Sequence, residues 1–108
     1  MLIVTTPTIE GAEIEAVLGM VRGNTTRARF VGRDIIAGLK MLAGGEISEY
    51  TELLMDARDQ SVDRMIDEAE KLGANAIVNV RFASSSIARG LSEILAYGTA
   101  VRIIKSNM

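Results

Sequence analysis

A long segment, Glu49 to Leu72, has the pattern of one amphipathic helix and constrains everything that surrounds it. At about 100° per residue, apolar side chains fall on one side and carboxylates on the other. Ser48 is a candidate N-cap, and Gly73 follows where a left-handed residue commonly ends a helix. The predicted apolar side comprises Tyr50, Leu54, Ser61, Val62, Met65, Ala69 and Leu72. The sequence therefore predicts a long helix packed against another layer.

Segments typical of strands lie before and after this helix. Leu2–Thr6 is apolar and β-branched and is followed by Pro7, which has no amide hydrogen for a sheet ladder, so we expect a short edge strand. Longer strands are predicted over Glu13–Thr26, Ala76–Ala83 and Ser92–Ile104. The polar residues Ser84–Gly90 have a length suited to a hairpin loop. A second, shorter helix is predicted to begin near Gly32 and Asp34 and to end at Gly44 and Gly45.

The order of these segments predicts an α+β fold in which a mainly antiparallel sheet packs on helices. A chain of 108 residues is the usual size of one domain, so we treat residues 1–108 as a single domain. In the strand Glu13–Thr26, strict alternation gives two sets that are both apolar or small. The first set is Ile14, Ala16, Leu18 and Met20, and the second is Val17, Gly19, Val21 and Gly23.

A sheet with two apolar faces needs cover on both of them. The predicted helices cover one face, and the other would expose a larger apolar patch than soluble monomers normally carry. We therefore expect the chain to associate with identical copies. The alternative is a monomer whose second face is shielded by the loop and the termini.

The composition excludes several classes of function. The chain has 14 acidic and 12 basic side chains, a net charge of -2, so no positive field favours nucleic acid or an anionic membrane. No apolar run is long enough for a membrane span, and the N-terminus lacks the pattern of a secretory signal, so we expect a cytoplasmic protein. Because Cys and His are both absent, thiolate nucleophiles, imidazole bases and the usual zinc ligands are excluded. We expect no enzyme activity, assign no catalytic residue and identify no cofactor.

Arg58 is predicted to project from the middle of the apolar side of the long helix, near Leu54, Val62 and Met65. A buried guanidinium needs a partner, because an isolated buried charge is costly. One interpretation is a buried ion pair that fixes how helix and sheet, or neighbouring subunits, dock, with Glu46, Glu49 and Glu93 as the candidate acids. The other is an anion pocket in which Arg58 acts with Arg33 or Arg81.

Other polar residues lie within predicted strands, and acidic residues offer weak metal ligands. Arg22 and Arg81 need either solvent or partners, and they could line a pore or an interface. The acidic side of the helix is most simply a solvated face. If a metal is bound, Glu46 and Glu93 at junctions between subunits are the candidate ligands.

Several motifs spread over the whole chain resemble the YbjQ-like family of small uncharacterised proteins. The N-terminal motifs are Val21-Arg22-Gly23-Asn24, Gly32-Arg33-Asp34-Ile35, Gly44-Gly45-Glu46 with Tyr50, Ala57-Arg58 and Arg64-Met65. The C-terminal motifs are Leu72-Gly73-Ala74-Asn75-Ala76-Ile77-Val78, Arg81-Phe82, Glu93-Ile94 and Ala96-Tyr97-Gly98-Thr99-Ala100-Val101. The resemblance implies a dodecin-like subunit with its last strand lying centrally, assembled as a homopentamer, and a family that is often labelled as heavy-metal-binding.

Together these observations predict a cytoplasmic homo-oligomeric protein that binds a small ligand or acts as a scaffold. Its partner is a copy of itself, and Arg22, Arg33, Arg58 and Arg81 are the candidate ligand contacts. The alternative is a metal-binding or metal-tolerance protein that uses Glu46 and Glu93.

Overall fold

The computed structural model describes residues 1–27, 48–88 and 91–106, which form a four-stranded sheet and a long helix. The elements are β1 (Leu2–Ile3), β2 (Ala12–Arg27), α2 (Ser48–Lys71), β3 (Ala76–Ala88) and β4 (Leu91–Lys105). The strand order is β1-β3-β4-β2; β1 runs parallel to β3, and the other pairs are antiparallel. The sheet is therefore mixed, and the last strand is central, as the resemblance implied. The shorter helix predicted from Gly32 lies outside the described residues.

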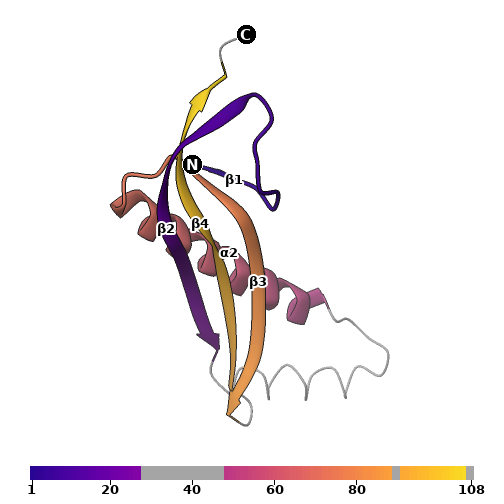
Figure 1. The fold of residues 1–108 in the computed structure, drawn as a ribbon. Coiled ribbons are helices and arrows are strands. Elements are labelled where there is room, and N and C mark those ends of the chain that lie inside the picture. Colours follow the sequence, from indigo (N-terminus) through magenta and orange to yellow (C-terminus); the bar gives the residue numbers. More distant parts are fainter. Residues whose placement is uncertain (28–47, 89–90, 107–108) are drawn as a thin grey trace.

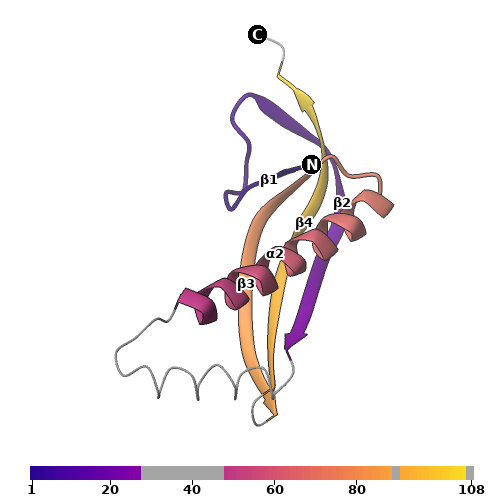
Figure 2. The same ribbon diagram turned by 180° about the vertical axis from the view of Figure 1, so that it is seen from behind.

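Helix α2 lies diagonally across one face of the sheet, and no helix of the described residues covers the opposite face (Figures 1 and 2). Its fully buried positions are four residues apart, so they form one stripe along the helix. These positions are Ala57, Ser61, Met65 and Ala69. Of these four, Met65 and Ala69 belong to the main core. The sheet contributes Val21 of β2, Ile77 of β3 and Ala96 and Ala100 of β4 to the same core. Because four of the residues at this contact are alanines, helix and sheet approach each other closely.

The end of α2 matches the sequence prediction. Gly73 has a φ of 85°, the left-handed conformation that residues other than Gly rarely adopt. Its N–H donates to the carbonyl of Glu70, and the N–H of Ala74 donates to that of Ala69, at 3.0 and 3.1 Å. This pair of bonds is a Schellman motif, which satisfies the last carbonyls of the helix. The predicted helix end at Gly73 is confirmed.

The N-terminal segment forms the edge of the sheet beside β3, which confirms the predicted edge strand. After β1, hydrogen bonds continue from Val4 N–H to the Ile77 carbonyl and from Val80 N–H to the Val4 carbonyl, at 2.9 and 3.0 Å. Beyond them, the segment crosses to the face opposite α2. There Val4 and Ile9 pack on a second, smaller cluster made by Ala76, Val78 and Val101.

A bulge in β3 lies where this segment crosses. Val78 pairs with Thr99 and Arg81 pairs with Tyr97, so Asn79 and Val80 together oppose the single residue between them. Asn79 has a φ of 55°, and its N–H donates to the Thr6 carbonyl at 3.0 Å. The bulge turns the side chain of Val80 into the main core and moves that of Arg81 to the opposite face.

One predicted connection is shorter than expected. The segment Ser84–Gly90 was predicted to be a loop, but β3 extends to Ala88 and β4 begins at Leu91. The serines pair across the ladder with β4, as in Ser84 with Ile94 and Ser85 with Glu93. Serine has a weak intrinsic preference for strands, and pairing with a well-formed neighbour overrides that preference. The loop prediction was therefore wrong for these residues.

Candidate functional site

The sheet face that α2 does not cover, called the open face here, holds two of the predicted arginines. Arg22 of β2 and Arg81 of β3 both lie opposite Tyr97 of the central strand β4. Residues directly opposite each other in antiparallel strands point to the same side of a sheet. The three residues Arg22, Tyr97 and Arg81 therefore form one row across the open face, the arginine–tyrosine row.

The dimensions of this row follow from the spacing of strands. Neighbouring strands lie about 4.8 Å apart, so the Cα atoms of Arg22 and Arg81 are roughly 10 Å apart, with Tyr97 between them. Both arginines are exposed, and Tyr97 is half-buried. An arginine side chain is long enough for two guanidinium groups at this spacing to reach one small ligand placed over the tyrosine.

Hydrogen bonds fix one arginine of the row. The Nη1 atom of Arg81 donates to the carbonyl oxygens of Thr5 and Val80, at 2.8 and 2.9 Å. The first bond ties the guanidinium to the N-terminal segment, and the second ties it to the backbone of β3 itself. Since a guanidinium has five N–H donors, Nε and Nη2 are left for other acceptors.

An apolar strip lies beside the row on the same open face. Ile14, Val17 and Met20 of β2 lie opposite Ile103, Val101 and Thr99 of β4. Val17 is 67% exposed and Met20 is 66% exposed, whereas Val101 is buried. We refer to Ile14, Val17 and Met20 as the β2 strip.

The β2 strip corrects the predicted faces of this strand. Strict alternation placed Ile14 and Met20 in one set and Val17 in the other. Two irregularities of register, between Ile14 and Ala16 and between Val17 and Gly19, bring all three residues to the open face.

The outer edge of β2 is partly occupied by side chains from α2. The backbone N–H of Arg22 donates to Oε1 of Glu68 at 3.3 Å, and Nη1 of Arg64 donates to the carbonyl oxygen of Asn24 at 2.6 Å. Edge strands carry unpaired backbone groups that invite another strand, and these two bonds satisfy one donor and one acceptor.

The four predicted arginine contacts are not all brought together. Arg58 is exposed on α2, on the other side of the sheet from the arginine–tyrosine row, so its predicted burial was wrong. The buried stripe of α2 runs through Ala57 and Ser61, and Arg58 lies outside that stripe, at an exposed position of the helix. Arg33 lies outside the described residues.

The predicted metal ligands are only partly described. Glu93 is half-buried on the open face, where its Oε2 atom accepts a hydrogen bond of 2.9 Å from Nδ2 of Asn24. Glu46 lies outside the described residues. Among the residues that the structure describes, no three acidic side chains converge as a cation would require, and the chain contains neither Cys nor His. The described donor set therefore does not fit a soft heavy metal.

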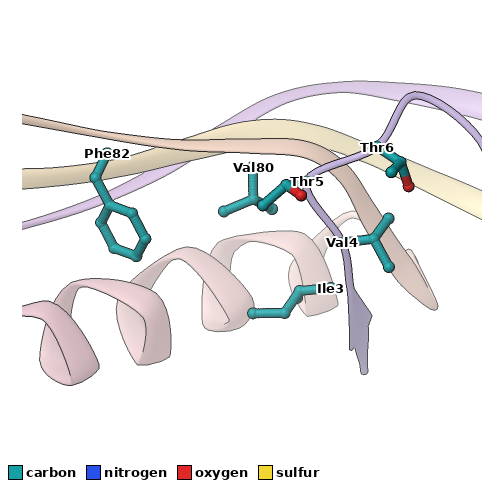
Figure 3. Close-up of a pocket in the computed structure, with 6 residues that line it drawn as sticks. All are labelled: Ile3, Val4, Thr5, Thr6, Val80 and Phe82. Carbon is teal, nitrogen blue, oxygen red and sulfur yellow. The ribbon is translucent and has the colours of Figure 1, made fainter.

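A hollow of about 450 Å³ lies beside β3 and the N-terminal segment (Figure 3). Phe82 and Val80 point into it from the side of the sheet that α2 covers, since Phe82 pairs with Ala96 of the main core. Its remaining lining comes from Ile3, Val4, Thr5 and Thr6. The hollow is mainly apolar, and two of its lining residues, Thr5 and Val80, accept hydrogen bonds from Arg81 through their carbonyl oxygens.

Within the parts of the chain described, no helix is long and apolar enough to cross a membrane. In the residues that the structure describes, a mixed four-stranded sheet with a long helix against it defines a small α+β protein. A crystal structure of a protein with unknown function from Pediococcus pentosaceus, of the DUF74 family, has this fold. The two agree with a TM-score of 0.60 at 17% sequence identity, over 96% of this chain and 98% of that one, a likeness that concerns the fold alone.

Sequence comparison gives the family. The chain belongs to the YbjQ family, whose model, described as "Putative heavy-metal-binding", matches residues 1–104. A UPF0145 protein of Thermosipho africanus is 57% identical over 107 residues, which are 99% of each chain. A UPF0145 protein of Halorubrum lacusprofundi is 64% identical over 98 residues, which are 91% of this chain and 94% of that protein. The family resemblance predicted from the motifs is confirmed.

Sequence reasoning missed Tyr97 as a member of the site. Tyr97 was noticed only as part of a C-terminal motif, and nothing in its local pattern relates it to Arg22 or Arg81. The one available signal was that both arginines lie within apolar strands, where charged side chains are uncommon. Their shared partner becomes visible only from the register of the strands.

Proposed function

We propose that this protein is a homo-oligomeric binding or scaffold protein whose subunits meet through the open face of the sheet. The observation that carries the proposal is the β2 strip, in which Val17 and Met20 each leave about two thirds of their surface exposed. Covering a large apolar side chain contributes about 1.5–3 kcal/mol, so burial of this strip favours association. A second copy of the chain is the simplest partner that supplies a complementary surface.

The edge of β2 supports contact through side chains. The two bulges twist the edge strand, and Glu68 and Arg64 occupy outward-facing backbone groups at Arg22 and Asn24. Both features disfavour the addition of another strand to an edge. In the proposed assembly, a neighbouring subunit therefore covers the side chains of the β2 strip and leaves the arginine–tyrosine row beside it uncovered. The homopentamer implied by the family resemblance is the expected assembly.

Sedimentation velocity of two matched variants tests the proposed contact. Val17→Asp places a charge in the β2 strip, and Met55→Asp places one at an exposed apolar residue of α2, 52% exposed, away from the open face. Val17→Asp is expected to shift the protein towards single subunits at micromolar concentration. Met55→Asp is expected to sediment as the unmodified protein does. Equal dissociation of both variants, or of neither, would place the contact elsewhere.

Small-ligand binding is the second part of the proposal, and it is supported by the two arginines of the open face. Arg22 and Arg81 lie beside the β2 strip, so a ligand held there would be close to the subunit contact. Arg58 and Arg33 were predicted to contribute as well; Arg58 lies on the other side of the sheet, so the arginine–tyrosine row is the better-supported contact surface.

Metal binding is the alternative function, because the description of the family model names heavy-metal binding. It would rest on Glu46 and Glu93, of which Glu93 already accepts a hydrogen bond from Asn24. Elemental analysis of protein purified without chelator tests it directly. A stoichiometric metal lost on mutation of Glu93→Gln would support this alternative over the one proposed above, and metal-free protein that binds no added copper, zinc or cadmium would remove it.

A further inference from the structure

We propose that the arginine–tyrosine row is a binding site for small aromatic anions, molecules that combine a flat ring with a carboxylate or phosphate group. This inference deepens the ligand-binding part of the proposed function. It does not depend on self-association, since Arg22, Tyr97 and Arg81 all come from one chain.

The charge around the arginine–tyrosine row is positive. The sheet rows on either side of the arginine–tyrosine row contain no acidic residue. One of them is Met20, Thr99 and Val78, and the other is Asn24, Leu95 and Ala83. The acidic residue on this face, Glu93, lies a further row away and accepts a bond from Asn24. Glu68 of α2 contacts the backbone N–H of Arg22 at the outer edge of β2. On the open face itself, two positive side chains face solvent with no carboxylate in the neighbouring rows, which favours an anionic ligand.

The spacing of Arg22 and Arg81 allows both guanidinium groups to contact one anion. Guanidinium groups bind carboxylates and phosphates through two parallel N–H···O bonds, and the anchored Arg81 loses less side-chain freedom when it does so. With their Cα atoms roughly 10 Å apart, Arg22 and Arg81 can approach one anionic group from opposite sides. This spacing suits a small ligand.

The aromatic residue Tyr97 lies between the two arginines in the row. Aromatic rings stack on one another in offset or edge-to-face arrangements, and tyrosine combines an apolar ring with a polar end. A ligand that carries both an anionic group and a ring would contact all three side chains, whereas a simple anion would contact only the arginines. We therefore expect an anion that carries a ring to bind more tightly than a simple anion.

Calorimetric titration with four probes tests the inference. Phenyl phosphate and benzoate carry both parts of the predicted ligand, inorganic phosphate lacks the ring, and phenol lacks the charge. Phenyl phosphate is expected to bind with a Kd at least tenfold lower than that of inorganic phosphate, benzoate more tightly than phenol, and phenol not measurably. Equal affinity for phenol and phenyl phosphate, or binding of none of the four probes, would overturn the inference.

Substitution of each residue of the arginine–tyrosine row tests whether phenyl phosphate binds there. Arg22→Gln and Arg81→Gln are each expected to raise the Kd for phenyl phosphate at least fivefold, and Tyr97→Leu to bring it close to that of inorganic phosphate. Arg58→Gln, which removes an exposed arginine on the other side of the sheet, is the matched control and is expected to leave the Kd unchanged. Loss of binding in Arg58→Gln equal to that in Arg22→Gln would contradict the row as the site.

Two further measurements separate folding and assembly from binding. Thermal melting checks each variant, and Arg81→Lys keeps the charge if Arg81→Gln fails to fold. The ring signals of Tyr97, assigned by comparison with Tyr97→Phe, are expected to shift on titration with phenyl phosphate. Sedimentation of the same samples shows whether self-association persists, so absence of binding in an intact oligomer would reject this inference and leave the subunit contact standing.

Discussion

Gly23 of β2 lies directly against the backbone carbonyl of Ser61 in α2, with no space between them for a side chain. A Cβ atom at Gly23 would overlap with the Ser61 oxygen and the Met65 nitrogen and would lie 2.8 Å from Cβ of Arg64. The contact involves helix backbone, which cannot move aside as the end of a flexible side chain can. The absence of a side chain at Gly23 therefore sets how closely the helix lies on the sheet.

We predict that Gly23→Ala destabilises the fold, because α2 must shift away from β2. Overpacking of this kind typically costs about 1–3 kcal/mol, and the rigid neighbours place Gly23 at the upper end. Urea unfolding measures the loss, with Thr26→Ala, at an exposed residue of the same strand, as the control expected to change stability by less than about 0.5 kcal/mol. Equal stability of Gly23→Ala and the unmodified protein would contradict the close approach described here.

A buried polar contact joins the same helix and strand. The hydroxyl of Ser61 lies 3.1 Å from that of Thr25 and also contacts the carbonyl oxygens of Ala57 and Ile94, at 2.9 and 3.1 Å. Ser61→Ala is expected to cost about 1–3 kcal/mol, because it leaves the buried Thr25 hydroxyl without this partner. The double variant with Thr25→Val should cost less than the sum of the two single changes. Strict additivity in a double-mutant cycle would show that the hydroxyls are not coupled.

The left-handed conformation of Asn79 predicts an ordered series of substitutions. Asn79→Gly is expected to retain stability within about 0.5 kcal/mol, since glycine adopts this conformation without strain. Asn79→Ala is expected to lose about 1 kcal/mol and Asn79→Val more, because a Cβ atom, and above all a branched one, is disfavoured there. Thermal unfolding of the three variants gives the order, and a more stable Asn79→Val would rule out the bulge.

Arg58 is exposed in the structure, whereas the sequence predicted that it would be buried. Since Arg58 is exposed, Arg58→Ala is expected to change the free energy of unfolding by less than about 0.5 kcal/mol. Loss of one partner from a buried ion pair would instead cost about 3–5 kcal/mol. Chemical denaturation of this variant therefore decides whether the guanidinium is buried.

The sequence predicts those parts of the fold that rest on local pattern. The strands, the long helix and its end at Gly73 are signalled by periodicity and by one glycine at a left-handed position. The extent of β3 is not signalled, because Ser84 and Ser85 become extended only through pairing with β4. The burial of individual helix positions is not signalled either, because it depends on the angle at which α2 crosses the sheet.

The candidate site could not be predicted from the local sequence pattern either, because β-bulges determine which face its residues occupy. Without the bulge at Asn79, alternation from Val78 would place Arg81 on the side that α2 covers; the bulge moves it to the open face beside Tyr97. The bulges of β2 likewise bring Val17 and Met20 to one face. A bulge reverses every side chain that follows it, so the faces of these strands follow from long-range pairing.

The central claim is that the β2 strip is covered by another copy of this chain, and the mass of the unmodified protein in dilute solution tests it most directly. Light scattering coupled to size exclusion is expected to give a constant multiple of the subunit mass of 11.6 kDa, about five times that value for the proposed homopentamer. A single species of 11.6 kDa at every concentration measured would contradict the account.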